Sequence, residues 1–473
     1  MRSMRYTIGR ATLLLLVVGA LPAVAQWNPS AGQWGRTEPT DFRIMTFNIR
    51  DGIRSTAEKS ESYNAWQALA RIVAAFRPDV LCMQEVGDLG NGVDSVATLT
   101  HVLSLFMYGG TDIYQNPAVP VTAYVQKYAP GYDLPHVYVS TVSDGFNRNV
   151  LLSRYPFVDL NGDTVAVRPR IYSVLIDPNV PWVPGGNDGI RGFINAEIDL
   201  PDTTYAGDMM VLTGHMKAGS TAADRQERLL AAQNIAYYID YLLNGAGTGM
   251  PDPHNRINDS PQVASILPPD TPVVLCGDWN EDEATNNRRG PADWITRAEL
   301  DGGTDGADRD RSDMTYDAAV EPRSGSRATF GDGSTKLDYV AWQDSIATLR
   351  RAFIFRSTAL QNFPTWYPPE IAPYPNPQLP DPVTISPMAS DHRPVIVDLV
   401  LPLVPAICPG DLNCDGVVDF NDIDRFVEAL GYAGGVGWPY PDCPWLAGDA
   451  SGDGQVTFDD IDPFVALIGT SCR

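Results

Sequence analysis

The stretch SDHRPVIVDL, residues 390–399, places an acid and an imidazole, Asp391 and His392, directly before an apolar run. Taken alone, it indicates a polar turn that leads into a buried strand, because Ser and Asp favour turns and VIVDL has the composition of a strand. Histidine is scarce, however, since the 473 residues contain only five. The pair is therefore also a candidate for catalysis, and the polar ends of other strands help to choose between the two interpretations.

Polar residues stand at the same kind of place along the chain, at one end of an apolar strand-like run. They are Asn48 in MTFN, Glu85 in VLCMQE, His215 in VLTGH, Asp278 and Asn280 in VVLCGDWN, and Asp338 in LDYVAW. Each residue alone is ordinary loop chemistry, and the GDWN turn needs no function to explain it. Their repeated occurrence at strand ends favours a shared site.

These residue types suit phosphate ester hydrolysis, which needs a cation, a base for the attacking water and a proton donor. An ion of the Mg²⁺ type prefers carboxylate and water oxygens. We therefore expect Glu85 to bind Mg²⁺ or Mn²⁺ with help from Asn48 or Asp391. Asp278 would then remain as the base.

Three further roles complete the expected site. Asn280, two residues after the base, would orient the water or a phosphate oxygen. His392, paired with Asp338, would be held as a protonated donor. Among the nearby cations, Arg148 and Lys217 are the expected phosphate contacts.

In the first 401 residues, segments with strand composition outnumber those with helical periodicity. Strands are expected at 42–49, 79–85, 149–154, 192–200, 209–215, 272–280, 336–342, 352–356 and 394–401. Helical periodicity marks 61–76 and 222–243. This balance predicts an α+β fold with two packed sheets and helices outside, rather than a doubly wound sheet. Residues 109–136, 179–190 and 363–387 are predicted surface insertions.

The order of the motifs resembles that of a known family. TFNIR, MQE, NVLLSRYP, TGHMKAG, GDWNEDE, KLDYV and SDHRPVIVDL occur in the order and approximate spacing of the endonuclease/exonuclease/phosphatase superfamily, over residues 42–401. The resemblance implies the DNase I-like β-sandwich flanked by helices, and metal-dependent phosphoester hydrolysis. It also implies a role for each motif residue: Asn48 and Glu85 at the metal, His215 on the scissile phosphate, Asp278 and Asn280 beside the nucleophile, and Asp338 orienting His392.

Residues 1–25 have the composition of a signal peptide. Arginines accompany the apolar run ATLLLLVVGALPAVA, which ends in the small-residue site Ala23-Val24-Ala25. A membrane anchor is the alternative, although the apolar run is shorter than the ~20 residues that span a bilayer. We therefore expect cleavage before Gln26, a secreted or extracytoplasmic protein, and no membrane segment after cleavage.

A repeat follows the predicted linker, residues 402–407. GDLNCDGVVDFNDIDRFVEAL and GDASGDGQVTFDDIDPFVALI are offset by 38 residues within a predicted small all-α domain, residues 408–473. Oxygen-bearing side chains stand at positions 1, 3, 5 and 12 of each EF-hand-like loop: Asp411, Asn413, Asp415 and Asp422, then Asp449, Ser451, Asp453 and Asp460. Such spacing wraps a hard cation, while a glycine at position 6 permits the sharp turn. We therefore expect one Ca²⁺ ion in each loop.

A helix is expected after each loop, because apolar residues recur there at helical spacing. The tail resembles the type I dockerin family, in which paired Ca²⁺ loops are each followed by one helix. The resemblance implies docking to a cohesin-type partner. The extra cysteines and the insert YAGGVGWPYPDCPWLA depart from the family pattern, so the identity of the partner stays open.

The cysteines fall into two groups. The tail contains Cys408, Cys414, Cys443 and Cys472. In an exported chain these indicate up to two disulfides, with three possible connectivities. Zinc is a weaker alternative, because the spacings fit no CxxC pattern. Cys82 and Cys276 lie in apolar strand-like runs and are predicted to be buried free thiols.

The fold predicts the reaction but not the substrate, since members of this superfamily cut DNA, RNA, sphingomyelin, inositol phosphates and nucleotides. The net charge of −24 argues against a grip on long duplex DNA. We expect an extracellular nuclease, with a phosphatase or a sphingomyelin-type phosphodiesterase as the alternative. Two alternatives come from other functional classes. One is a non-catalytic scaffold or adhesion protein. The other is a glycosidase, for which the only argument is the resemblance of the tail to dockerins.

Overall fold

The computed structural model describes residues 27–53, 58–87, 94–143, 147–168, 190–245, 266–286, 290–296, 314–331, 333–372, 379–404, 407–441 and 443–472. The chain divides into a front unit, which runs to Leu200 and from Asp208 to Leu401, and a tail unit, which joins Pro201–Gly207 to the residues from Pro402 onward. The predicted signal peptide and nearly all of the predicted insertion 179–190 lie outside the described residues.

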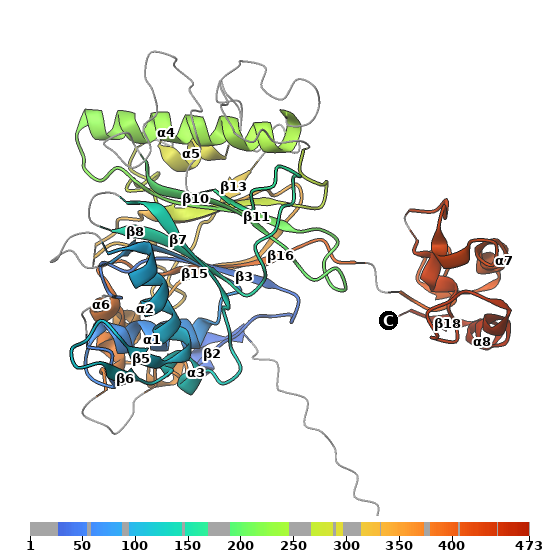
Figure 1. Cartoon of the computed structure of the whole chain (residues 1–473), viewed down its shortest axis with the longest axis horizontal. Coiled ribbons are helices and arrows are strands. Elements are labelled where there is room, and N and C mark those ends of the chain that lie inside the picture. Colours follow the sequence, from blue (N-terminus) through green and yellow to red (C-terminus); the bar gives the residue numbers. More distant parts are fainter. Residues whose placement is uncertain are drawn as a thin grey trace, which may run out of the picture. The chain divides into compact units, whose positions relative to one another are not determined.

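Two six-stranded sheets form the centre of the front unit (Figure 1). Sheet I contains, in spatial order, β15 (Thr348–Ile354), β16 (Val395–Val400), β3 (Phe42–Asn48), β4 (Val80–Val86), β8 (Arg148–Ser153) and β7 (His136–Ser143). Sheet II contains β13 (Thr315–Tyr316), β14 (Asp338–Trp342), β12 (Val273–Asp278), β11 (Met209–Met216), β10 (Ile190–Ile198) and β9 (Val167–Arg168). Each sheet has one parallel pair near its middle, β3 with β4 and β11 with β12, and is otherwise antiparallel.

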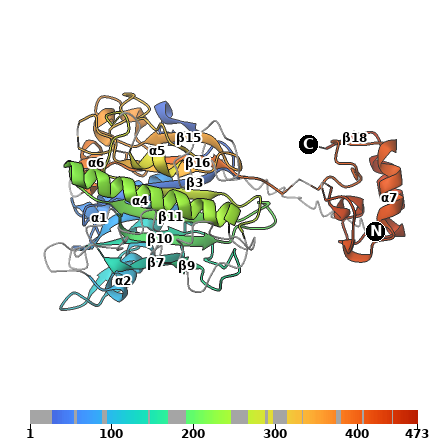
Figure 2. The same cartoon turned by 90° about the horizontal axis from the view of Figure 1, so that it is seen from above.

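Helices cover the outer faces of the two sheets, which confirms the predicted sandwich with helices outside (Figures 1 and 2). On the side of sheet I lie α1 (Ala65–Phe76), α2 (Val96–Tyr108), α3 (Tyr124–Tyr128) and α6 (Ile385–Ala389). On the side of sheet II lie α4 (Ala222–Asp240) and α5 (Pro291–Ile295). Two further strand pairs are β1 (Trp27–Asn28) with β2 (Gln33–Trp34), and β5 (Gly110–Asp112) with β6 (Val119–Val121).

The long helices begin at side-chain caps, as α1 and α4 illustrate. The Asn64 side chain accepts the N–H of Gln67 at the start of α1. Thr221 and Asp224 form a reciprocal capping box at the start of α4. These bonds satisfy N–H groups that the first turn of a helix leaves without a partner. The local sequence thus fixes where each long helix starts.

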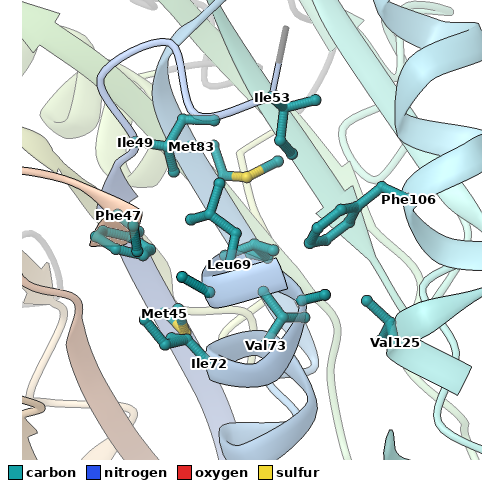
Figure 3. Close-up of a cluster of buried hydrophobic side chains, with 14 of the residues drawn as sticks. Met45, Phe47, Ile49, Ile53, Leu69, Ile72, Val73, Met83, Phe106 and Val125 are labelled. Carbon is teal, nitrogen blue, oxygen red and sulfur yellow. The ribbon is translucent and has the colours of Figure 1, made fainter. Parts of the chain in front are cut away.

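The core between α1 and sheet I is entirely apolar at its centre (Figure 3). Leu69 and Val73 of α1 pack against Met45 and Phe47 of β3, and Phe106 of α2 closes one side. Each of these side chains is at most 1% exposed. This packing holds β3 rigidly, and the C-terminal end of β3 carries one of the predicted site residues.

The tail unit contains the two expected helices and a short strand pair. The elements are α7 (Ile423–Ala429), α8 (Ile461–Leu467), β17 (Val417–Val418) and β18 (Thr470–Ser471). The rings of Phe426 and Phe464, one from each repeat, stack with centroids 4.4 Å apart. Disulfides join Cys408 to Cys472 and Cys414 to Cys443, so the structure selects one of the three connectivities.

The structure bears on the predicted linker and on the prediction that no membrane segment follows the signal peptide. Part of the predicted linker 402–407 is paired, because the N–H of Val404 donates to the carbonyl of Thr204 within the tail unit. Across the described ranges, the helices are all too short or too polar to cross a bilayer.

Candidate active site

The predicted residues meet at one edge of the sandwich because of how the strands pair. In the parallel pair β3 and β4, Asn48 lies opposite Gln84, and in the parallel pair β11 and β12, His215 lies opposite Asp278. The strand β14 runs antiparallel to β12, so Asp338 at its start also lies opposite Asp278. Strand ends from both sheets therefore carry these polar side chains to one place.

Asp278 is the centre of the resulting cluster. Its Oδ2 atom accepts a hydrogen bond from Nδ2 of Asn48 at 2.9 Å, and it lies 3.4 Å from Nε2 of His215 and 3.6 Å from Nε2 of His392. The same Asn48 amide donates to Oε1 of Glu85 at 3.0 Å. Four of these five side chains are buried, and Glu85 is 25% exposed. The cluster thus opens towards solvent at Glu85.

The environment of Asp278 favours its protonated form. Burial raises the pKa of this carboxyl to about 7; the charge of His392 opposes the rise, and that of Asp338 adds to it. A carboxylate whose pKa lies near neutral pH is well suited to accept a proton from water. A pKa near 7 thus suits the base role that the sequence predicts for Asp278.

His392 and Asp338 form a buried pair beside this carboxylate. Nδ1 of His392 lies 2.8 Å from Oδ2 of Asp338. Burial lowers the pKa of His392, but the charges of Asp338 and Asp278 outweigh that effect and raise it to about 10. The imidazole is consequently protonated at neutral pH and can donate a proton.

Asn280 and Ser390 hold the surrounding backbone. The N–H of Asn280 donates to Oδ1 of Asp278 at 2.9 Å, and its Nδ2 donates to the carbonyl of Met216 at 3.1 Å. The hydroxyl of Ser390 donates to the carbonyl of Asn48 at 2.7 Å and accepts the N–H of His392 at 3.0 Å. The Asp391–His392 pair is thereby tied to β3.

The backbone at this edge is unusual in several places. Residues other than glycine with φ in the left-handed region include Arg50, Asp51, Glu85 and Asn280, at φ values of 43°, 60°, 55° and 54°. Such conformations are costly and cluster at functional sites. Gly277 has a φ of 153°, and a Cβ there would lie 1.9 Å from the carbonyl oxygen of Gly214. The GDWN turn therefore requires its glycine.

Comparison with known proteins identifies the family. A model of the Endonuclease/Exonuclease/phosphatase family matches residues 45–392. The chain belongs to this family. The match confirms the resemblance that the motifs predicted, and it ends at His392, the last residue of the cluster. A search of curated protein sequences finds no match.

Solved structures with a similar fold include three from different organisms. An endonuclease/exonuclease/phosphatase from Beutenbergia cavernae is 16% identical, covering 76% of this chain and 72% of its own, with a TM-score of 0.40. Sphingomyelinase C from Streptomyces griseocarneus is 16% identical, covering 76% and 99%, with a TM-score of 0.38. TDP2 from D. rerio, complexed with a single-strand DNA product, is 10% identical, covering 76% and 99%, with a TM-score of 0.37.

The donor atoms of this Endonuclease/Exonuclease/phosphatase family member fit a divalent cation. Ligand atoms of Glu85, His215 and Asp278 lie within 4.8 Å of one another. The carboxylate oxygens of Glu85 and Asp278 are hard donors of the kind that Mg²⁺ and Mn²⁺ prefer, and the third ligand atom of the group is an imidazole nitrogen of His215. Asp391 does not belong to this group, and its Oδ2 lies 3.4 Å from Nε of Arg50. A metal-binding role for Asp391 stays a prediction.

The two predicted phosphate contacts have different surroundings. The guanidinium of Arg148 donates to the backbone carbonyls of Asp94, Ser140 and Thr141, each at 2.9 Å. These bonds tie the start of β8 to its neighbours. Lys217 is half-buried and follows the end of β11, two residues after His215. For both residues, contact with phosphate stays a prediction.

Sequence reasoning did not single out two residues that touch His392. Ser390 was interpreted only as part of a turn, and its position two residues before the histidine was the available signal. The ring of Phe330 lies with its centroid 5.0 Å from that of the imidazole. No local pattern marks Phe330, because it reaches His392 through pairing between distant segments.

Proposed function

We propose that this chain is a divalent-metal-dependent phosphodiester hydrolase, and that the cluster around Asp278 carries out the reaction. The observation that carries the proposal is the contact of one buried carboxylate with Asn48, His215 and the imidazole of the His392–Asp338 pair. It combines a proton acceptor, a proton donor and oxygen ligands in one place, which is what phosphoester hydrolysis requires.

Glu85 and Asn48 would hold Mg²⁺ or Mn²⁺, with Asp391 as a further ligand. When bound, such an ion neutralises the charge of the phosphate oxygens. Water is the nucleophile. Asn280 positions Asp278. Asp278 takes a proton from the water as the water oxygen bonds to phosphorus. His215 contacts the scissile phosphate, and Arg148 and Lys217 contribute positive charge.

The leaving oxygen receives its proton from His392. Because the raised pKa keeps the imidazole protonated at neutral pH, Asp338 acts by stabilising the charge and fixing the ring. As the bond from phosphorus to the leaving oxygen breaks, the proton moves from Nε2 of His392 to that oxygen. The products are an alcohol and a phosphomonoester.

A nuclease is the substrate class that we favour, and a phosphatase or sphingomyelin-type phosphodiesterase is the second candidate, which the net charge of −24 supports. The test incubates the purified chain with plasmid, single-stranded DNA, RNA, sphingomyelin and a phosphomonoester, with and without EDTA. Metal-dependent cleavage of a nucleic acid supports a nuclease. Cleavage of the phosphomonoester alone contradicts phosphodiester hydrolysis.

The tail unit, we infer, binds one Ca²⁺ in each repeat. The carboxylate of Asp411 accepts the N–H groups of Asp415 and Gly416, and that of Asp422 accepts those of Asn413 and Asp419. In the second repeat, Asp449 and Asp460 make the corresponding bonds. Both loops are thereby folded around their acidic side chains, as Ca²⁺ loops are.

Docking to a cohesin-type partner is the role that we propose for the tail. Each repeat exposes a matching pair of apolar side chains, Phe420 and Val427 in the first and Phe458 and Val465 in the second, which are 59–77% exposed. Large exposed apolar patches mark protein interaction sites, and we propose that these four side chains belong to the contact surface. Binding to a cohesin that is abolished by EDTA and by Phe420→Ser with Phe458→Ser would support docking.

Secretion completes the proposal. The basic and apolar composition of residues 1–25 supports export, and the disulfides of the tail unit suit an oxidising compartment. N-terminal sequencing of the protein recovered from outside the cytoplasm would find Gln26 as the first residue. An intact Met1 in that protein would contradict cleavage.

A further inference from the structure

The segment before β14 places an aromatic ring at the mouth of the site. The ring of Phe330 lies with its centroid 5.0 Å from that of His392, and the two ring planes are inclined at 58°. Phe330 is 41% exposed, whereas His392 is 5% exposed. Part of this ring therefore contacts the proton donor, and the rest is open to solvent, although no step of the proposed hydrolysis uses it.

Backbone pairing fixes this ring on both sides. Phe330 and His392 form an antiparallel bridge, in which the N–H of Gly331 donates to the carbonyl of Asp391 at 2.8 Å. On the other side, the N–H of Phe330 donates to the carbonyl of Thr335 at 3.2 Å. An exposed aromatic side chain on a rigid backbone loses little further freedom when it meets a ligand. The position is thus organised before substrate arrives.

The same segment borders a space that could receive a polar ring. A cavity of about 570 Å³ has Thr335, Leu337 and Asn280 in its lining. The remaining lining residues are mainly polar or charged, and they include Gln226, Arg225 and Glu281. Phe330 itself is not in this lining, but the segment that carries it supplies Thr335 and Leu337. A nucleobase, with two flat faces and a polar edge, matches an exposed aromatic ring on a segment that also lines a polar cavity. An acyl chain would instead require a broad apolar surface.

We propose that Phe330 is a specificity-determining residue that stacks on the base of the leaving nucleoside, an inference that rests on the proposed phosphodiester hydrolysis. In the proposed reaction, His392 protonates the oxygen through which the leaving nucleoside is attached to phosphorus. Phe330 contacts the imidazole of His392 and therefore lies on the side of the leaving nucleoside. Stacking on an aromatic side chain is tolerant of sequence because every base has a flat face. The substrate class that this stacking favours is a nucleic acid with an unpaired base, and the net charge of −24 disfavours a long duplex.

The experiment compares dithymidine monophosphate with its two abasic analogues, each of which lacks the base on one side. The full chain, Phe330→Ala, Phe330→Trp and the control Tyr114→Ala are assayed with Mg²⁺ or Mn²⁺, and kcat and KM are measured for each. Tyr114 is a suitable control, because it is also 41% exposed but contacts His101 and not the site. Thermal melting reports whether each variant is folded.

The wild type should show a KM roughly 5- to 100-fold lower for the dinucleotide than for the analogue without the leaving-side base. Phe330→Ala should remove this difference by raising only the KM for the dinucleotide, while Phe330→Trp and Tyr114→Ala keep it. An equal fall of kcat on all substrates, with the base preference unchanged, would assign Phe330 a merely structural role and overturn the inference.

Two other outcomes separate this inference from the proposed function. If the wild type hydrolyses sphingomyelin but neither dinucleotide nor analogue, the choice of a nucleobase is wrong, and phosphodiester hydrolysis still holds. If the wild type hydrolyses no phosphodiester with any metal, both proposals are wrong.

Discussion

Nδ1 of His392 lies 2.8 Å from Oδ2 of Asp338, and both side chains are almost fully buried. The carboxylate thereby holds a positively charged imidazole in a place where burial alone would favour the neutral ring. This contact links β14, which begins at Asp338 within the KLDYV motif, to the SDHRPVIVDL stretch. The largest contribution that raises the pKa of His392 therefore comes from a residue 54 positions away in the sequence, and Asp278 adds to it.

Asp338→Asn should separate the charge of this pair from its shape. Asparagine keeps the size of the side chain but removes the charge that raises the pKa of His392, so less of the imidazole is protonated. We expect kcat to fall by roughly 10²- to 10⁴-fold, which is the usual contribution of a general acid. The high-pH limb of the rate profile, expected near the pKa of about 10 in the wild type, should move to lower pH. An unchanged limb would contradict this role for Asp338.

The stabilising effect of His392 should depend on pH. Its pKa is raised from 6.5 to about 10 in the folded chain. The resulting stabilisation is complete below pH 6.5 and is lost as the pH rises through about 10. Denaturant unfolding in EDTA should therefore show that His392→Gln is less stable than the wild type at pH 6.5, with a difference that shrinks towards pH 10. A difference that grows with pH would contradict the sign of the shift.

Removal of metal should stop hydrolysis without unfolding the front unit. EDTA should abolish turnover, and added Mg²⁺ or Mn²⁺ should restore it, because Glu85 and Asn48 are proposed to hold the ion. Glu85→Gln should raise the metal concentration needed for half-maximal activity by at least about tenfold, since it removes one carboxylate ligand. Glu38→Gln serves as the control, because Glu38 is exposed and precedes the N-terminal end of β3, whereas Asn48 lies at the C-terminal end of that strand. Full activity in EDTA would exclude the metal-dependent mechanism.

Calcium should stabilise the tail unit. A ligand that binds only the folded state at 100 times its Kd adds about 2.7 kcal/mol of stability, so Ca²⁺ should raise the Tm of the transition assigned to the tail. Asp415→Ala should reduce this shift, because it removes an exposed oxygen ligand of the first loop. Asp424→Ala, an exposed position in α7, should leave the shift unchanged. A Tm that is the same in Ca²⁺ and EDTA would argue against both loops.

Local sequence predicted the central elements but not those at the margins. The apolar run 42–49 and the helical pattern 61–76 correspond to β3 and α1, because caps and burial act on neighbouring residues there. The strand β7 was missed, since it lies at the edge of sheet I and is only partly buried, which weakens its alternation. The helix α2 was missed as well, although Ser95 and Gly109 cap its two ends.

The site was predictable as a set of strand ends but not as a set of contacts. Their positions at strand ends, their chemistry and the order of the motifs placed Asn48 and Asp278 in one predicted site. The structure adds that their side chains are hydrogen-bonded. That contact depends on which strands are neighbours across the two sheets, and sequence periodicity carries no such information. The Arg50–Asp391 ion pair and the ring of Phe330 beside His392 depend on the same long-range pairing.

The rate of phosphodiester hydrolysis by the wild-type chain and by Asp278→Asn, measured on the same substrate panel at equal Mg²⁺, tests the central claim most directly. The account predicts that the wild type cleaves at least one phosphodiester and that the variant, folded as judged by its Tm, is slower by at least about 100-fold. Equal rates in the two proteins would show that the cluster around Asp278 is not the catalytic site.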